Sequence, residues 1–125
     1  MEHRVIYSLY KFWTETFTSQ SIFISLKGEM NMTNTLMSIQ VIPKHQETGV
    51  IPLVDEAISI IEQSGLKYEV HPLETTIEGD MNACLILIEQ INERMVELEC
   101  ESIISQVKFY HVPDGIAMET LTEKY

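Results

Sequence analysis

The chain has 125 residues, of which 45% are hydrophobic, and a formal net charge of −11 at pH 7. This length supports one domain with a buried core, and the hydrophobic content is typical of a globular protein. Nucleic acids and anionic membrane surfaces are negatively charged, so the acidic sequence argues against both as partners and is compatible with a cationic small ligand.

Residues 1–31 differ in composition from the remainder. They contain three basic and three acidic side chains, so the net charge of −11 resides in residues 32–125. Charged and polar residues interrupt their apolar stretch and no small-residue cleavage motif follows it, which argues against a membrane helix and a signal peptide. We expect residues 1–31 to be a disordered extension or a start-site artefact, with translation beginning at Met30 or Met32, and residues 32–125 to form the domain. The intact mass of the protein from its native host tests this expectation.

Alternating apolar residues predict a first strand at Leu36–Ile42, followed by a polar connection over residues 43–49. The next segment repeats apolar residues at helical spacing: Ile51, Val54, Ile58 and Ile61. Pro52 suits the first turn of a helix and Gly65 suits the position after its last turn, so we expect a helix between them.

A β-hairpin is predicted next, because Leu66–Pro72 and Thr75–Gly79 alternate in hydrophobicity on either side of a Pro-Leu-Glu break. Asp80 or Asn82 can cap a second helix. The apolar stripe of this helix consists of Cys84, Leu87, Ile88, Ile91, Met95 and Leu98. Its charged residues lie off the stripe and are interpreted as a solvated face.

The last elements are a strand at Ser102–His111 and, after a Pro-Asp-Gly turn, a short helix at Ile116–Tyr125. The order β-α-β-β-α-β is that of an α+β, ferredoxin-like sandwich with a short C-terminal helix. Right-handed crossovers place both long helices on one face of the sheet. The opposite face then carries polar side chains, namely Ser38, Gln40, Glu69, His71, Thr76, Glu78, Gln106 and Lys108.

The two cysteines, Cys84 and Cys100, lie sixteen residues apart in the second expected helix. A rise of about 1.5 Å per residue places them more than about 20 Å apart, beyond the reach of a disulfide. We therefore expect both thiols to be reduced and the protein to be cytoplasmic. The sequence has no Cys-x-x-Cys or His-x-x-x-His spacing, so no metal site is expected.

Four segments together resemble a known family. They are residues 38–43 (SIQVIP), 54–58 (VDEAI), 64–70 (SGLKYEV) and 72–79 (PLETTIEG). In order and spacing they resemble the thiamine-binding family of small bacterial, archaeal and fungal proteins, over about residues 35–125. The resemblance implies a ferredoxin-like fold, assembly into dimers or tetramers through the sheets, no catalytic activity, and non-covalent binding of thiamine or a related aminopyrimidine.

Thiamine presents a thiazolium cation and an aminopyrimidine, which call for a carboxylate, hydrogen-bonding groups and an apolar or aromatic wall. We expect the ligand-binding residues to be Gln40, Tyr68, His71, Thr75, Thr76 and Glu78. Glu78 supplies the carboxylate in this hypothesis, with Glu69 as a second source. Gln40 supplies both a donor and an acceptor. The threonines supply a hydroxyl, and Tyr68 or His71 a stacking surface.

Each assignment has a structural alternative. Glu78 can simply end a strand, Tyr68 can pack in the core, and His71 can be a hydrogen-bonded turn residue beside a proline.

Two further function classes therefore stay open. The polar face can be the interface of an oligomeric structural or regulatory module, since a ferredoxin-like fold hosts many functions. An enzyme using His71 with Glu69 or Glu78 is less favoured, because no nucleophile, phosphate-loop or metal motif accompanies them; we expect a non-enzyme without a cofactor.

Overall fold

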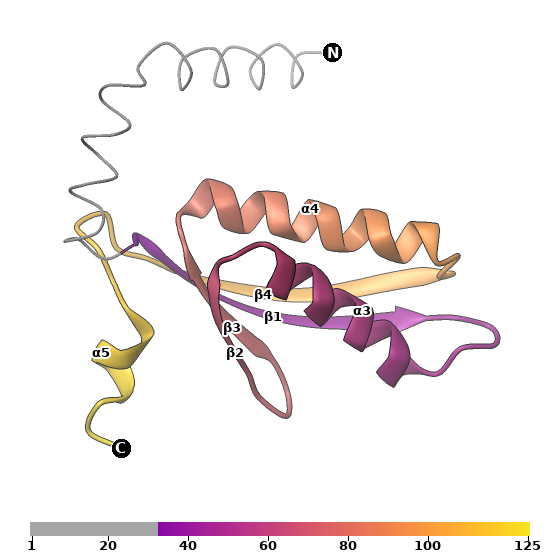
Figure 1. Cartoon of the computed structure of the whole chain (residues 1–125), viewed down its shortest axis with the longest axis horizontal. Coiled ribbons are helices and arrows are strands. Elements are labelled where there is room, and N and C mark those ends of the chain that lie inside the picture. Colours follow the sequence, from indigo (N-terminus) through magenta and orange to yellow (C-terminus); the bar gives the residue numbers. More distant parts are fainter. Residues whose placement is uncertain (1–32) are drawn as a thin grey trace, which may run out of the picture. The chain divides into compact units, whose positions relative to one another are not determined.

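A four-stranded sheet and two long helices dominate the part of the chain that the computed structural model describes, residues 33–125. The expectations for residues 1–31 lie outside the described residues. In chain order the elements are β1 (Thr35–Lys44), α3 (Val50–Gln63), β2 (Lys67–Val70), β3 (Thr75–Gly79), α4 (Met81–Glu97), β4 (Ser102–His111) and α5 (Met118–Thr122). Figure 1 shows α3 and α4 covering the same face of the sheet. The predicted β-α-β-β-α-β order and the α+β, ferredoxin-like arrangement are confirmed.

The strands are ordered β2-β3-β1-β4, and every neighbouring pair is antiparallel. β1 pairs with β4 along its whole length, from Thr35 to Lys44. It pairs with β3 only from Thr35 to Ile39. The second half of β1 therefore has a strand on one side only within the described residues.

The register assigns side chains to the two faces of the sheet, because directly paired residues point the same way. Met37 lies opposite Ile77 and Phe109, on the face that the helices cover. Ser38 lies opposite Thr76 and Lys108, on the face that α3 and α4 leave open. Each polar strand residue predicted for the open face lies on it: Ser38, Gln40, Glu69, Thr76, Glu78, Gln106 and Lys108.

The stripe predicted for the second helix is confirmed by the burial of α4, whose fully buried residues are Cys84, Leu87, Ile91 and Met95. The stripe predicted for the first helix is partly wrong: Ile61 is buried as predicted, whereas Ile51, Val54 and Ile58 are not. The residues of α3 that reach the core are Leu53, Ala57 and Ile61, whereas Ile51 is 76% exposed. α3 is apolar over more than one stripe, so the sheet covers one stripe and leaves part of the other uncovered.

Four predicted boundaries need correction. The first strand of the hairpin, predicted over Leu66–Pro72, is shorter in the structure, where β2 spans Lys67–Val70. β1 extends to Lys44, beyond Ile42, because β4 supplies a backbone partner along this whole stretch. Cys100 lies after α4, which ends at Glu97, so the two cysteines do not share a helix. The terminal helix begins at Met118 because Ile116 N donates to Thr33 O at 2.6 Å and the chain is still extended at Ala117, before the helix starts.

Gly65 ends α3 as predicted. Its φ of +75° lies in the left-handed region that glycine adopts without strain, one residue after the helix cap at Ser64. This sharp end directs the chain into β2 and so sets where the hairpin lies beside α3.

Candidate functional site

A groove of about 490 Å³ lies between α3, the second half of β1 and the tip of the β2–β3 hairpin. Its walls are mainly aliphatic, contributed by β1, by α3 and by the hairpin tip. Its polar lining residues are Gln40, Asp55, His71, Glu74 and Thr75. Small-molecule sites are typically about 300–1,000 Å³, mostly apolar, with a few polar groups, and this groove fits that description.

The groove exists because β3 stops pairing with β1 at Ile39 while β1 continues to Lys44. The hairpin turns back at this point, where His71 N donates to Glu74 O at 2.9 Å. The N-terminal half of α3 therefore overhangs a stretch of β1 that no strand of residues 33–125 flanks on that side. Ile51, Val54 and Ile58 line the resulting space.

The charged groups that line the groove are acidic. Asp55 comes from α3 and Glu74 from the hairpin tip, and neither a lysine nor an arginine is among its lining residues. Glu74 Oε2 accepts a hydrogen bond from Ser38 Oγ at 2.5 Å, which ties the hairpin tip to β1. His71 Nε2 lies 3.4 Å from Glu69 Oε2, so a protonated imidazole would be paired within the hairpin. The groove therefore offers negative charge beside an apolar wall.

The structure separates the predicted site residues into two groups. Gln40, His71 and Thr75 line the groove. Tyr68 lies opposite Ile77 on the helix-covered face and packs against the core. Thr76 and Glu78 lie on the open face, away from the groove. The prediction that all six contact a ligand stays a prediction.

Glu78 occupies a closed environment on the open face. It is only 9% exposed, and its Oε2 atom has no hydrogen-bond partner among the described residues. Lys67 Nζ is 3.9 Å from this oxygen and also pairs with Glu119 of α5. Leu36, which pairs with Glu78 in the sheet, is buried against Ile116 and Met118. The C-terminal segment thus covers this end of the face that α3 and α4 leave open.

Sequence patterns did not identify part of the groove. The helical spacing predicts Ile51, Val54 and Ile58 for the core, and Asp55 lies off that stripe. The available signal was the excess of apolar residues in α3, because Leu53 and Ala57 already form a stripe sufficient to cover the sheet. A second apolar stripe on a short helix indicates a second surface that needs an apolar partner.

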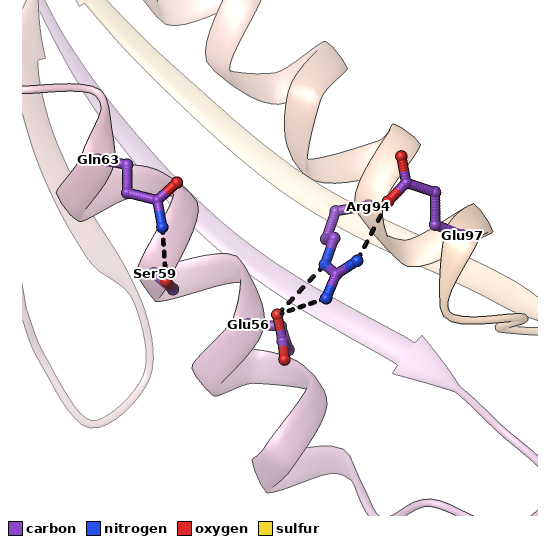
Figure 2. A network of polar contacts seen from close by, with 5 residues as sticks. All are labelled: Glu56, Ser59, Gln63, Arg94 and Glu97. Atoms are coloured by element: carbon purple, nitrogen blue, oxygen red, sulfur yellow. Dashed lines mark hydrogen bonds and ion pairs between the residues drawn. The ribbon is translucent and has the colours of Figure 1, made fainter.

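Arg94 links α4 to α3, the helix that forms one wall of the groove. Its Nε and Nη2 atoms both donate to Glu56 Oε2, and Nη1 donates to Glu97 Oε2 (Figure 2). The hydrogen bonds that the Arg94 guanidinium donates to Glu97 and Glu56 raise its pKa. Figure 2 shows the three side chains meeting between the two helices.

Residues 33–125 contain no cluster of three or more metal-binding side chains. Both cysteines are free thiols, and burial raises the pKa of the Cys84 thiol to about 11. No helix in the same part of the chain combines the length and hydropathy needed to span a membrane.

Comparison with known proteins identifies the family. The sequence matches the family described as thiamine-binding protein over residues 37–125. A UPF0045 protein from Clostridium perfringens is 33% identical over 89 residues, which cover 71% of this chain and 94% of the relative.

Two solved structures of similar proteins have the same fold. A domain of unknown function (DUF77) from Bacillus cereus superposes with a TM-score of 0.70 at 31% identity, covering 74% of this chain and 90% of the other. A Thermotoga maritima protein provisionally assigned to thiamine biosynthesis or salvage superposes with a TM-score of 0.67 at 27% identity, covering 74% of this chain and 98% of the other. The family predicted from the sequence motifs is confirmed: this chain belongs to the thiamine-binding protein family.

Proposed function

We propose that this protein binds thiamine or a related aminopyrimidine without catalysing its conversion, and that the groove beside α3 is the binding site. The observation that carries the proposal is the combination of an aliphatic groove with acidic charge at its edge, in a chain of this family. The name of the Thermotoga maritima relative points to the same class of molecule.

The groove suits the two rings of thiamine in different ways. The aliphatic side chains of α3 and β1 provide a surface for the flat rings. Asp55 and Glu74 provide negative charge for the thiazolium. A charge-assisted contact of this kind contributes about 1.5–3 kcal/mol when it is well aligned. Because His71 and Thr75 are at the same groove, a polar substituent of the ligand finds hydrogen-bonding partners there.

Calorimetric and thermal-shift titration of the full chain tests the proposal. Thiamine and its free pyrimidine alcohol are titrated separately, with choline as a control that has the cationic charge and no rings. Thiamine that binds only the folded protein adds about 2.7 kcal/mol of stability at a hundred times its dissociation constant, and the melting temperature rises accordingly. Absence of heat and of any shift at saturating thiamine would remove the proposal.

The alternative proposal is an oligomeric structural or regulatory module that has no thiamine ligand. It is favoured by the apolar side chains on the open face, where Ile42 is 39%, Ile104 57% and Tyr110 52% exposed. Exposed apolar residues that share one sheet face are typical of an interface between subunits. Light scattering after size exclusion tests self-association to a dimer or tetramer, and Ile104→Lys should weaken it. If the Ile104→Lys variant forms the oligomer as well as the unaltered chain does, the interface lies elsewhere.

A further inference from the structure

The second half of β1 pairs with β4 but not with β3, so one edge of the strand lies at the groove. β3 last pairs with β1 at Ile39, opposite Thr75. In an antiparallel strand the N–H and C=O of one residue point to the same side, and successive residues point to opposite sides. A single main-chain hydrogen bond of β1 is therefore enough to assign the side to which each of its residues directs its N–H and C=O.

Two hydrogen bonds at the ends of β1 set that direction. Glu101 N donates to Lys44 O at 2.7 Å, and Val112 N donates to Asn34 O at 2.8 Å. Both donors belong to the segments that flank β4, so the even-numbered residues of β1 direct their main-chain groups toward β4. The main-chain groups of Val41 and Pro43 consequently point to the other side of β1, beyond the part that pairs with β3.

The groove reaches this edge of the strand. Its lining includes four consecutive residues, Ile39 to Ile42, whose side chains alternate between the two faces of the sheet. A groove confined to one face would contact only every second residue. A groove that contacts residues of both faces must run along the edge of the strand, toward which the main-chain groups of Val41 are directed.

We propose that the main-chain N–H and C=O of Val41 bind the amine-bearing edge of an aminopyrimidine. The exocyclic amine donates to the C=O, and the neighbouring ring nitrogen accepts from the N–H. The ligand thus takes the place that a residue before Thr75 would hold if β3 began earlier. This assignment rests on the proposed function and specifies which part of the ligand lies deepest in the groove. The thiazolium then lies toward Asp55 or Glu74.

The same edge is poorly suited to an added peptide strand. A strand pairing here would use Val41 and then Pro43, and Pro43 has no N–H to donate. The tip of the hairpin, with Pro72 and Leu73, also lines the groove and would obstruct a long extended chain. A planar ligand that needs one donor and one acceptor requires only Val41.

Amide hydrogen exchange followed by NMR tests the assignment without a mutation. In the free protein the Val41 amide should exchange rapidly, whereas the amides of Gln40 and Ile42, directed toward β4, are protected. Saturating thiamine should slow exchange at Val41 at least about tenfold. A Val41 amide that still exchanges rapidly in thiamine-saturated protein would overturn the assignment, even though thiamine binding itself would stand.

Ligand and protein variants separate the two hydrogen bonds. 4-Deaminothiamine, which has hydrogen in place of the amine, cannot donate to the Val41 C=O from this edge and should bind about tenfold or more weakly than thiamine. Val41→Pro removes the groove-side N–H and no main-chain group that faces β4, and Val41→Ile is the control that keeps the N–H. Equal affinity for thiamine and 4-deaminothiamine contradicts the assignment, whether or not the proline variant folds. If thiamine itself produces no calorimetric heat or thermal shift, the proposed function fails first and the assignment fails with it.

Discussion

Arg94 of α4 donates from both Nε and Nη2 to one carboxylate oxygen of Glu56 on α3, each at 3.2 Å. The guanidinium also donates to Glu97 at 3.1 Å, one turn further along its own helix. Two helices that pack on the same sheet face are thus joined by a single cation that two carboxylates share. Because α3 forms one wall of the groove, this contact also bears on the geometry of the proposed site.

Removing this contact should have a small, measurable effect on stability. The Arg94 and Glu56 side chains are 38% and 43% exposed, so solvent screens their attraction and the pair should contribute about 0.2–1 kcal/mol. Urea denaturation of Arg94→Ala, Glu56→Ala and the double variant isolates the coupling free energy. Glu62→Ala on the same helix is the control for loss of an acidic side chain. Strictly additive effects of the two substitutions would show that the pair contributes nothing.

Two neighbouring residues of α3 should separate stability from binding. Leu53 is 3% exposed, so Leu53→Ala leaves a cavity in the core and should lower the free energy of unfolding by about 2–5 kcal/mol. Ile51 is 76% exposed and lines the groove, so Ile51→Ala should change stability by less than about 0.5 kcal/mol and weaken thiamine binding. Denaturant unfolding and calorimetry measure the two effects. An unchanged affinity for thiamine in the Ile51 variant would mean that the ligand does not contact this wall.

Local patterns were sufficient for most elements and insufficient for the groove. Thr75–Gly79 and Ser102–His111 were predicted with the observed bounds, because alternation and turn residues delimit a short strand clearly. The core stripe of α4 follows directly from its 3.6-residue period. The length over which β1 pairs with β3 has no such local signature, since it depends on where the hairpin turns back in space. The groove lies where β1 continues beyond that pairing, so it could not be predicted from local patterns.

The residues of the candidate site show the same division. Gln40 was placed correctly on the open face by the period of two, yet it also borders the groove because the strand beside it ends. Thr75 was expected to supply an accessible hydroxyl, but it is 7% exposed because it pairs with Ile39 on the helix-covered face. Glu78 lies on the expected face and is nevertheless buried, at the end of the sheet where residues after β4 cover its cross-strand partner Leu36. Long-range packing of this kind is absent from any local pattern.

The Cys84 thiol should make stability depend on pH in the alkaline range. Burial first, and the nearby Asp80 carboxylate second, raise its pKa from 9.0 to about 11. The folded state therefore holds this proton more tightly than the unfolded state. The resulting stabilisation is complete below about pH 9 and is lost as the pH rises through about 11.

Cys84→Ala should flatten the decrease in stability across this pH window, as measured by urea denaturation at several pH values. Cys100→Ala is the matched control for a thiol outside the helix. Thiol labelling of the folded protein at pH 8 should also be slow at Cys84, because the neutral thiol is a poor nucleophile. Rapid labelling of Cys84 without unfolding would contradict both expectations.

The charge of the groove should discriminate between thiamine and its phosphate esters. Asp55 and Glu74 border the groove, and the N-terminal end of α3, with about half a positive charge, only partly offsets them. Thiamine carries a net positive charge, whereas its diphosphate carries a net negative charge. We expect the diphosphate to bind at least about tenfold more weakly, equivalent to about 1.4 kcal/mol. Equal calorimetric affinities would mean that the phosphates extend into solvent, beyond the reach of both carboxylates.

Asp55 and Glu74 can be distinguished by neutral substitutions that preserve shape. Asp55→Asn and Glu74→Gln should each weaken thiamine binding by up to about tenfold, and the loss should shrink as ionic strength rises and screens the attraction. Glu74→Gln also alters the hydrogen bond from Ser38, so Ser38→Ala is needed to separate that effect from the loss of charge.

Glu62→Gln removes an equal charge from α3 outside the groove and controls for the overall acidity of the chain. If the Glu62 variant loses as much affinity as the Asp55 variant, thiamine is responding to the net charge of −11 and not to a carboxylate in the groove. An affinity lowered only by Asp55→Asn would place the thiazolium beside α3, on the side of the groove opposite the hairpin tip.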